Sequence, residues 1–121
     1  MANTFKVVTF AAEPASAGPP YVMYTVASST TAVVLGLVLS NINTTAVTAE
    51  VELVSTTSSR GGANNVANGT SFLIKDVSIP TGSSLEILSG GKVVLEAGDK
   101  IQIDCSVADK LSGTLSIMEI T

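Results

Sequence analysis

Carboxylates are the side chains with the widest scope for chemistry in this chain, because histidine is absent and cysteine occurs once. Glu50 and Glu52 are two residues apart, so an extended strand would place both on one face. General acid–base catalysis would also need a pocket that shifts their pKa values apart, and nothing in the flanking sequence predicts one. The pattern favours a solvated strand face over a carboxylate active site.

The other candidate reactive groups are also weakly supported. Four carboxylates in the last third of the chain do not match the spacing of an EF-hand loop, so an irregular calcium loop is the alternative left open; they are Glu96, Asp99, Asp104 and Asp109. A lone Cys105 can form neither an internal disulfide nor a thiolate cluster, and its alternation with Ile101 and Ile103 predicts a small buried hydrophobe. The glycines near residues 61 and 91 are too sparse for a phosphate loop. We therefore predict a protein that is not an enzyme, with no cofactor and no metal.

The amino-acid composition indicates which classes of binding partner to expect. Of the 121 residues 13% are charged, and the net charge of −4 comes without the basic stripe that nucleic acid binding needs. The longest apolar run, residues 32–39, is far shorter than the roughly 20 residues of a membrane-spanning helix, and the first residues do not resemble a signal peptide. We expect a soluble protein made in the cytoplasm, without nucleic acid or membrane partners, whose uncharged Ser- and Thr-rich surface is covered by neighbouring subunits.

The elements that must position these residues are strands. Short runs of β-branched residues alternate with polar ones and are separated by Gly, Asn, Pro and Ser, which predicts an all-β fold. Residues 21–121 are expected to form a single β-sandwich or jelly-roll-like domain of about eight short strands, at residues 21–27, 33–41, 47–55, 70–79, 85–88, 93–95, 100–107 and 114–120. Residues 1–20 are expected to form an extended N-terminal arm, since three prolines prevent regular structure in its second half, although residues 4–10 could form a strand.

Two irregularities are predicted inside the strands. Residues 32–39 are apolar on both faces, as in a central strand covered on both sides or one whose outer face meets another subunit. Gly36 within this run indicates a bulge or a close approach of another backbone. The apolar alternation slips between Ile74 and Val77, which predicts a bulge or a bend.

The arm and its surroundings supply the candidate partner-binding residues. Aromatic residues beside a proline-rich arm could be anchors that dock onto a partner, or could fold back over the core of their own chain. Arg60, the one arginine, lies in the long polar connection 56–69 and either pairs with a carboxylate of a neighbour or keeps the loop soluble. The candidate interface residues are Phe5, Val7, Phe10, Pro14, Pro19, Pro20, Tyr21, Tyr24 and Arg60.

One part of the chain resembles a known group of proteins. The stretches that carry the resemblance are residues 73–85 (LIKDVSIPTGSSL), 91–101 (GKVVLEAGDKI) and 115–120 (LSIMEI). They resemble the small virion structural proteins of tailed bacteriophages, in which a KxVLEAGDK turn between strands and a final strand ending in Glu-Ile recur. By itself the turn motif predicts a hairpin, with Gly98 at positive φ between residues 93–95 and 100–107.

The resemblance implies a β-sandwich subunit of a phage particle with no catalytic residues to carry over. We expect a capsid decoration (cement) protein that contacts the major capsid or tail protein, associates with copies of itself, as a trimer, and resides in the virion after synthesis in the host cytoplasm. The alternatives are a neck, tail or fibre subunit, or a surface module that binds carbohydrate or a receptor.

Overall fold

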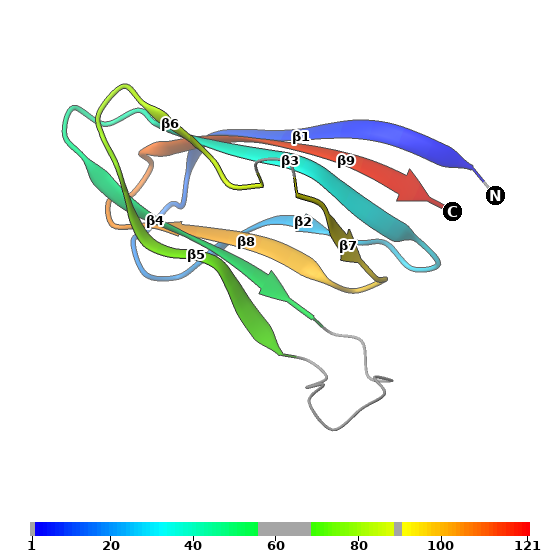
Figure 1. The fold of residues 1–121 in the computed structure, drawn as a ribbon. Helices are drawn as coiled ribbons and strands as arrows, with labels where there is room; N and C mark the ends of the chain where they lie inside the picture. The colour runs from blue at the N-terminus through cyan, green and yellow to red at the C-terminus, as the bar shows by residue number, and fades with distance from the viewer. Residues whose placement is uncertain (1, 56–68, 89–90) are drawn as a thin grey trace.

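The structure is a computed structural model that describes residues 2–55, 69–88 and 91–121. It is all-β over these ranges, as predicted, and contains no helix there (Figure 1). The strands are β1 (Asn3–Glu13), β2 (Tyr21–Thr25), β3 (Thr31–Asn41), β4 (Val47–Val54), β5 (Thr70–Ile79), β6 (Ser84–Glu86), β7 (Val93–Leu95), β8 (Lys100–Cys105) and β9 (Leu111–Ile120).

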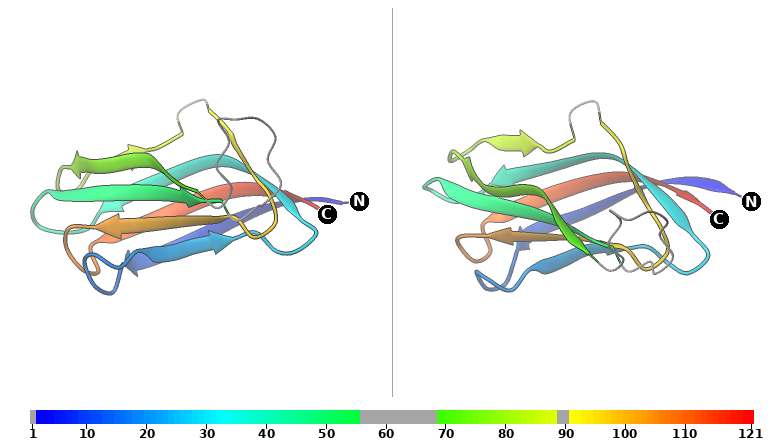
Figure 2. Two further views of the ribbon diagram at one scale, coloured as in Figure 1. Left: turned by 90° about the horizontal axis from the view of Figure 1, so that it is seen from below. Right: turned by 60° about the horizontal axis from the view of Figure 1, so that its bottom comes forward.

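The strands form two antiparallel sheets that pack face to face, which confirms the β-sandwich (Figures 1 and 2). The first sheet has the order β1-β9-β3-β6, and β7 also pairs with β3. The second sheet has the order β2-β8-β4-β5. Strands β1 and β2 are therefore edge strands, one in each sheet.

The core between the sheets follows directly from the period of two in the strands. Alternate residues of β9, such as Leu115 and Ile117, are fully buried, as are Val51 of β4 and Ile103 of β8. Cys105 continues the inward row of β8 and is buried with them, which confirms its predicted place as a small hydrophobe.

The N-terminal segment differs from the predicted arm. Residues 3–13 form β1, which pairs with β9 from Asn3 opposite Ile120 to Glu13 opposite Leu111. Between β1 and β2 the proline-containing stretch 14–20 lacks regular structure. The prolines limit structure locally, but they leave the preceding residues free to pair with the last strand of the chain, so the sandwich begins at residue 3 rather than at residue 21.

At both predicted irregularities the structure contains a bulge. The register between β3 and β9 shifts between Val34 and Gly36, and an added Cβ at Gly36 would have no atom within 4 Å, so the glycine marks a bulge and not a close approach. In β5 the register shifts between Ile74 and Val77, and Asp76 adopts a positive φ of 52° there. The extra residue in each strand lets the apolar side chains resume the inward face.

The turn at residues 96–99 does not make a hairpin, contrary to the prediction. Strand β7 pairs with β3 in the first sheet, whereas β8 pairs with β2 and β4 in the second, so the turn crosses from one sheet to the other. Asp99 is buried and its carboxylate accepts a hydrogen bond from the Glu96 amide at 3.0 Å. Gly98, at φ 88°, donates to the Val26 carbonyl, and the Val26 amide donates to the Asp99 carbonyl, both at 3.0 Å. These bonds hold the crossing in place.

Candidate functional site

The outward face of the first sheet carries an apolar row. Phe5 of β1 is in register with Met118 of β9, Met118 with Val33 of β3, and Val33 with Val94 of β7. We call these four residues the outer apolar row. Phe5 is 72% exposed and Val94 is 62% exposed, while the two central side chains are partly buried. The alternation that fills the core thus leaves a second apolar set on the opposite side of the same sheet.

This face of the first sheet lacks charge over four of its strands. Val7 and Leu35 add exposed apolar surface near the row. Among the described residues, the outward positions of β1, β9, β3 and β7 hold no ionisable side chain, and the nearest outward charge in register is Glu86 of β6, opposite Val38. A large apolar area without charge is the kind of surface that proteins use for binding one another.

The outward face of the second sheet has the opposite character. Its strands carry six charged residues at outward or bulge positions, namely Glu50, Glu52, Lys75, Asp76, Lys100 and Asp104. This confirms the prediction that Glu50 and Glu52 lie on one face of a strand. The two outer surfaces of the sandwich therefore differ in charge. The first is uncharged over four strands, whereas the second carries these six charged residues beside two exposed apolar side chains, Val22 and Phe72.

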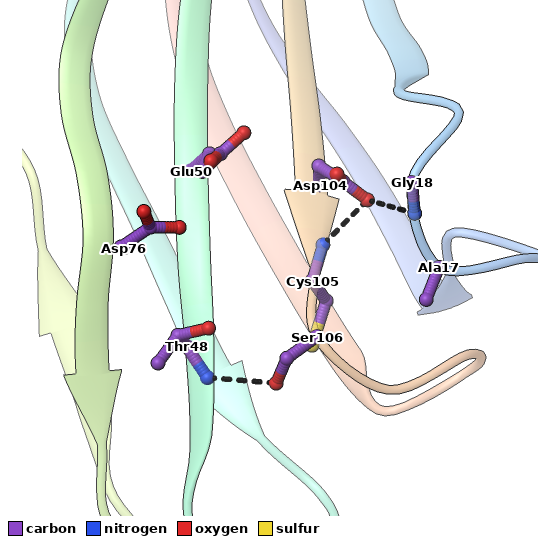
Figure 3. A pocket seen from close by; sticks show the side chains of 8 residues that line it. All are labelled: Ala17, Gly18, Thr48, Glu50, Asp76, Asp104, Cys105 and Ser106. Carbon is purple, nitrogen blue, oxygen red and sulfur yellow. Dashed lines mark hydrogen bonds between the residues drawn. The ribbon is translucent and has the colours of Figure 1, made fainter.

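A shallow hollow lies on the ionic face, between the strands of the second sheet and the loop at Gly18 (Figure 3). Its volume is about 160 Å³, below the roughly 300–1,000 Å³ of typical small-molecule sites. Its lining residues are Ala17, Gly18, Thr48, Glu50, Asp76, Asp104, Cys105 and Ser106. A hollow of this size and openness does not suit the enclosure of a substrate.

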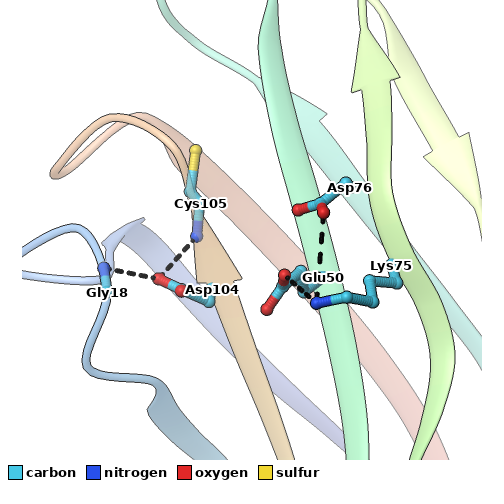
Figure 4. A network of polar contacts seen from close by, with 6 residues as sticks. All are labelled: Gly18, Glu50, Lys75, Asp76, Asp104 and Cys105. Atoms are coloured by element: carbon cyan, nitrogen blue, oxygen red, sulfur yellow. Dashed lines mark hydrogen bonds and ion pairs between the residues drawn. The ribbon is translucent and has the colours of Figure 1, made fainter.

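The carboxylates at this hollow already have partners (Figure 4). Lys75 Nζ lies 3.1 Å from Glu50 Oε1 and 4.0 Å from Asp76 Oδ2. Asp104 Oδ1 accepts hydrogen bonds from the amides of Gly18 at 3.2 Å and Cys105 at 2.8 Å. The hydrogen bond to Glu50 raises the pKa of Lys75, as expected for an ammonium paired with a carboxylate.

Neither metal binding nor thiol chemistry finds support in the described ranges. No group of three or more Cys, Asp or Glu side chains in those ranges is placed to hold a metal ion. Burial raises the pKa of the Cys105 thiol, so the nucleophilic thiolate is disfavoured. The described ranges also contain no helix of the length and apolarity that a membrane crossing requires.

The predicted interface residues divide between surface and core. Phe5 and Val7 are exposed on the outward face, as an interface would require. Phe10 is instead a core residue, because β1 places it opposite Gly113, where its ring contacts that of Tyr21 edge-on at 5.4 Å. Phe10 therefore folds back over the core of its own chain, the predicted alternative to docking onto a partner.

The remaining candidates lie in and after the connection between β1 and β2. Pro14 is buried and its carbonyl accepts a hydrogen bond from the Asp109 amide at 2.8 Å, while Pro19 and Pro20 are exposed. Tyr21 and Tyr24 pack partly buried against the core. Arg60 lies outside the described residues.

A polar cluster that sequence reasoning missed joins the two sheets at one end of the sandwich. Lys6 Nζ lies 2.7 Å from Glu119 Oε1, and the Tyr24 hydroxyl donates a hydrogen bond to Glu119 Oε2. The bonds from Lys6, then from Tyr24, lower the pKa of Glu119. The pKa of Tyr24 is raised, first by burial and then by this hydrogen bond. The three residues are far apart in sequence. The one feature of the sequence that could have indicated the cluster is a charged side chain at an inward position of a strand.

We predict that Glu119→Gln weakens the fold in a pH-dependent way. At pH 7 the free energy of unfolding should fall by about 1–2 kcal/mol, because two charge-assisted hydrogen bonds are lost. Since the folded-state pKa of Glu119 is lowered, its contribution is present above the unfolded value and is lost as the pH falls through the folded value. The difference between wild type and variant should therefore shrink between pH 5 and pH 2, a range set by the ordinary Glu pKa of about 4.3.

Urea unfolding across that pH range measures the effect. Glu86→Gln is the matched control, because Glu86 is an exposed carboxylate on β6 and exposed substitutions usually change stability by less than about 0.5 kcal/mol. Equal losses in the two variants, or a Glu119→Gln deficit that is independent of pH, would contradict the proposed role of the cluster.

The chain was also compared with known proteins. No protein-family model matches it, and no curated protein sequence matches it. A chain from a solved structure described as "Bacillus endospore appendages form a novel family of disulfide-linked pili" aligns over 99% of this chain and 87% of that chain, with a TM-score of 0.47 and 17% sequence identity. Similarity at this level assigns neither a family nor a function.

Proposed function

We propose that this protein is a non-enzymatic structural subunit of a tailed-phage particle, and specifically a capsid decoration (cement) protein. Its role in this proposal is to bind the shell through one face and to present the other face to solvent. The phage assignment rests on the sequence resemblance in residues 73–120. The binding mode rests on the structure.

The contrast between the two outer faces carries the proposal. The outer apolar row, with Val7 and Leu35 nearby, gives the first sheet a surface that gains free energy when water is excluded. The six charged residues of the second sheet would instead lose hydration if they were covered. A subunit with this arrangement is suited to lie flat on a protein surface with its first sheet inward.

The alternatives have less support from the described residues. A carbohydrate-binding module needs exposed aromatic side chains beside polar groups in a pocket. Phe5, the most exposed aromatic residue, lies on a flat uncharged sheet face. Phe72, 46% exposed on the second sheet, has Lys75 Nζ 4.5 Å from its ring centroid and does not line the hollow. An enzyme that uses carboxylates alone would need Glu50 or Asp104 free of their present partners. A neck or tail position uses the same face, so it differs from the shell role only in the protein contacted.

Incorporation into particles tests the proposal. Particles purified from the phage that encodes this chain should contain it in a constant ratio to the major capsid protein, measured by quantitative mass spectrometry. Val94→Asp should lower that content by about fivefold or more, because a carboxylate would be buried at the apolar contact. Ser78→Asp adds the same charge to the exposed ionic face and should leave the content unchanged.

The outcomes separate the parts of the proposal. Absence of the wild-type chain from purified particles would overturn the virion assignment. Normal incorporation of Val94→Asp would show that the first sheet does not face the shell. A constant ratio to a tail protein rather than to the capsid protein would move the subunit to the tail.

A further inference from the structure

Strand β1 leaves one long sheet edge open. Its outer side pairs with no strand in the described ranges, and it spans 11 residues. The other edges have features that limit pairing: β6 and β7 have three residues each, β2 has five with a register shift, and β5 contains the bulge at Asp76. A long edge without a bulge over most of its length is a template for another strand.

The hydrogen bonds at the chain ends show which groups of β1 face this edge. The Ala2 amide donates to the Thr121 carbonyl at 3.1 Å, and the Thr121 amide donates back to the Ala2 carbonyl at 2.9 Å. In an antiparallel pair such reciprocal exchange occurs at every second residue. The even-numbered residues of β1 therefore bond to β9, and the amides and carbonyls of Asn3, Phe5, Val7 and Thr9 point to the open edge.

We propose that this edge pairs antiparallel with β1 of a second copy of the chain, about a two-fold axis at Val7. Val7 would lie opposite Val7 of the second copy, and Phe5 opposite Thr9 of the second copy, in both directions. Each of these residues offers one donor and one acceptor to the edge, and pairs of aromatic or β-branched residues stabilise neighbouring strands. The inference rests on the proposed function, for which it supplies a two-fold contact between copies in place of the trimer expected from the sequence.

Charge disfavours one of the two registers that lie one residue away. A shift of one residue toward the N-terminus would centre the axis on Lys6 and set two ammonium groups directly opposite, which is unfavourable. The other, with the axis at Val8, pairs no like charges and sets Phe5 opposite Ala11, and the charge exchange at Val7 distinguishes it from the proposed axis. With the axis at Val7, Lys6 faces Val8 of the second copy and keeps its ion pair with Glu119 of its own chain. The partner is a second copy because the residues that point their amides and carbonyls to the edge are uncharged and mostly β-branched or aromatic. The charged Lys6 of the same strand is neutralised by Glu119 of its own chain.

The pairing would extend the apolar face. A two-fold axis perpendicular to the sheet keeps both outward faces on one side, so the outer apolar rows of the two copies lie on the same side of the dimer. The rows are offset along β1, because Phe5 faces Thr9 of the second copy and not Phe5. Strand β1 is at the edge of the first sheet in both views of Figure 2, with β2 at the corresponding edge of the second sheet. Nine paired residues span about 30 Å, giving on the order of 300 Å² per copy against about 800 Å² for a standard interface. The isolated dimer should thus be weak and gain strength on a shell, where several contacts act together.

Charge exchange at Val7 tests the axis and the partner together. Sedimentation equilibrium of the purified chain up to about 1 mM should show a reversible monomer–dimer equilibrium, as expected for an interface of this size. Val7→Lys and Val7→Glu should each weaken dimerisation by about tenfold or more, because like charges would lie opposite one another. An equimolar mixture of the two variants should dimerise at least as well as the wild type, since only a mixed dimer pairs opposite charges.

A second pair of variants separates the backbone ladder from the side chain. Val7→Pro removes an amide that points away from β9, so the fold should persist by circular dichroism while dimerisation falls by about tenfold or more. Val7→Thr keeps the amide and the branched shape and should change dimerisation by less than about threefold. A wild-type chain that is monomeric at 1 mM, or a mixture that dimerises no better than its components, would overturn the inference. Because these measurements use the isolated chain, their failure is distinct from a failure to enter particles.

Discussion

Replacement of Phe10 by alanine is expected to lower the free energy of unfolding by about 3–5 kcal/mol, the usual cost of removing a buried phenylalanine ring. Phe10 is 8% exposed, packs edge-on against Tyr21, and lies at the point where β1 closes one edge of the core. The result would show that the first strand is part of the folded domain and not a separable arm. Chemical denaturation followed by circular dichroism measures it.

Phe5→Ala is the matched control in the same strand, because it removes the same ring from a position that is 72% exposed. Its effect on stability should be less than about 0.5 kcal/mol. If Phe10→Ala fails to fold, Phe10→Leu provides the measurement, with a smaller loss because most of the apolar volume remains. Equal effects at positions 5 and 10 would contradict the burial pattern of β1.

The strands could be predicted because their signals are local. Alternation in β4 and β8 gives the faces of Val51 and Ile103 from neighbouring residues alone. The bulge at Gly36 and the slip between Ile74 and Val77 interrupt that alternation visibly, so they too could be predicted.

Pairing between strands could not be predicted in the same way. The turn at Gly98 is as compatible with a hairpin as with the observed crossing between sheets, because the partner of β7 is decided by β3, some 60 residues earlier in the chain. The same holds for β1, whose partner β9 is at the opposite end of the sequence. Prolines at positions 14, 19 and 20 predict irregular structure only in the connection that contains them.

The candidate surface depends on these long-range registers. Phe5 and Val7 were predicted as contact residues from their type and position. Their alignment with Met118, Val33 and Val94 required the register of four strands at once. The ion pair of Lys6 with Glu119 could not be predicted for the same reason. A charged residue at an inward strand position does not indicate which distant residue it pairs with.

Gly113→Ala is expected to destabilise the fold by about 1–3 kcal/mol, the range for adding a methyl group to a filled core. Gly113 lies in β9 between Phe10 of β1 and Leu39 of β3. A Cβ at this position would overlap Phe10 Cε2 and lie 2.5 Å from Cζ, so the ring would have to move. The glycine is thus required by close packing and not by its backbone angles, and thermal or urea unfolding measures the loss.

Gly36→Ala is the matched control, because a Cβ there would meet no atom within 4 Å. It should leave stability unchanged or raise it by up to about 1 kcal/mol, since alanine restricts the unfolded chain. The double variant Phe10→Leu with Gly113→Ala should be more stable than the sum of the two single losses predicts, by about 1 kcal/mol, because the smaller side chain vacates the space of the new methyl group. Strict additivity would show that the ring and the glycine do not share one packing site. A coupled result would show that β1 packs against β9 at Phe10 and Gly113 in the folded chain, and hence that the edge left open by β1 belongs to the folded subunit.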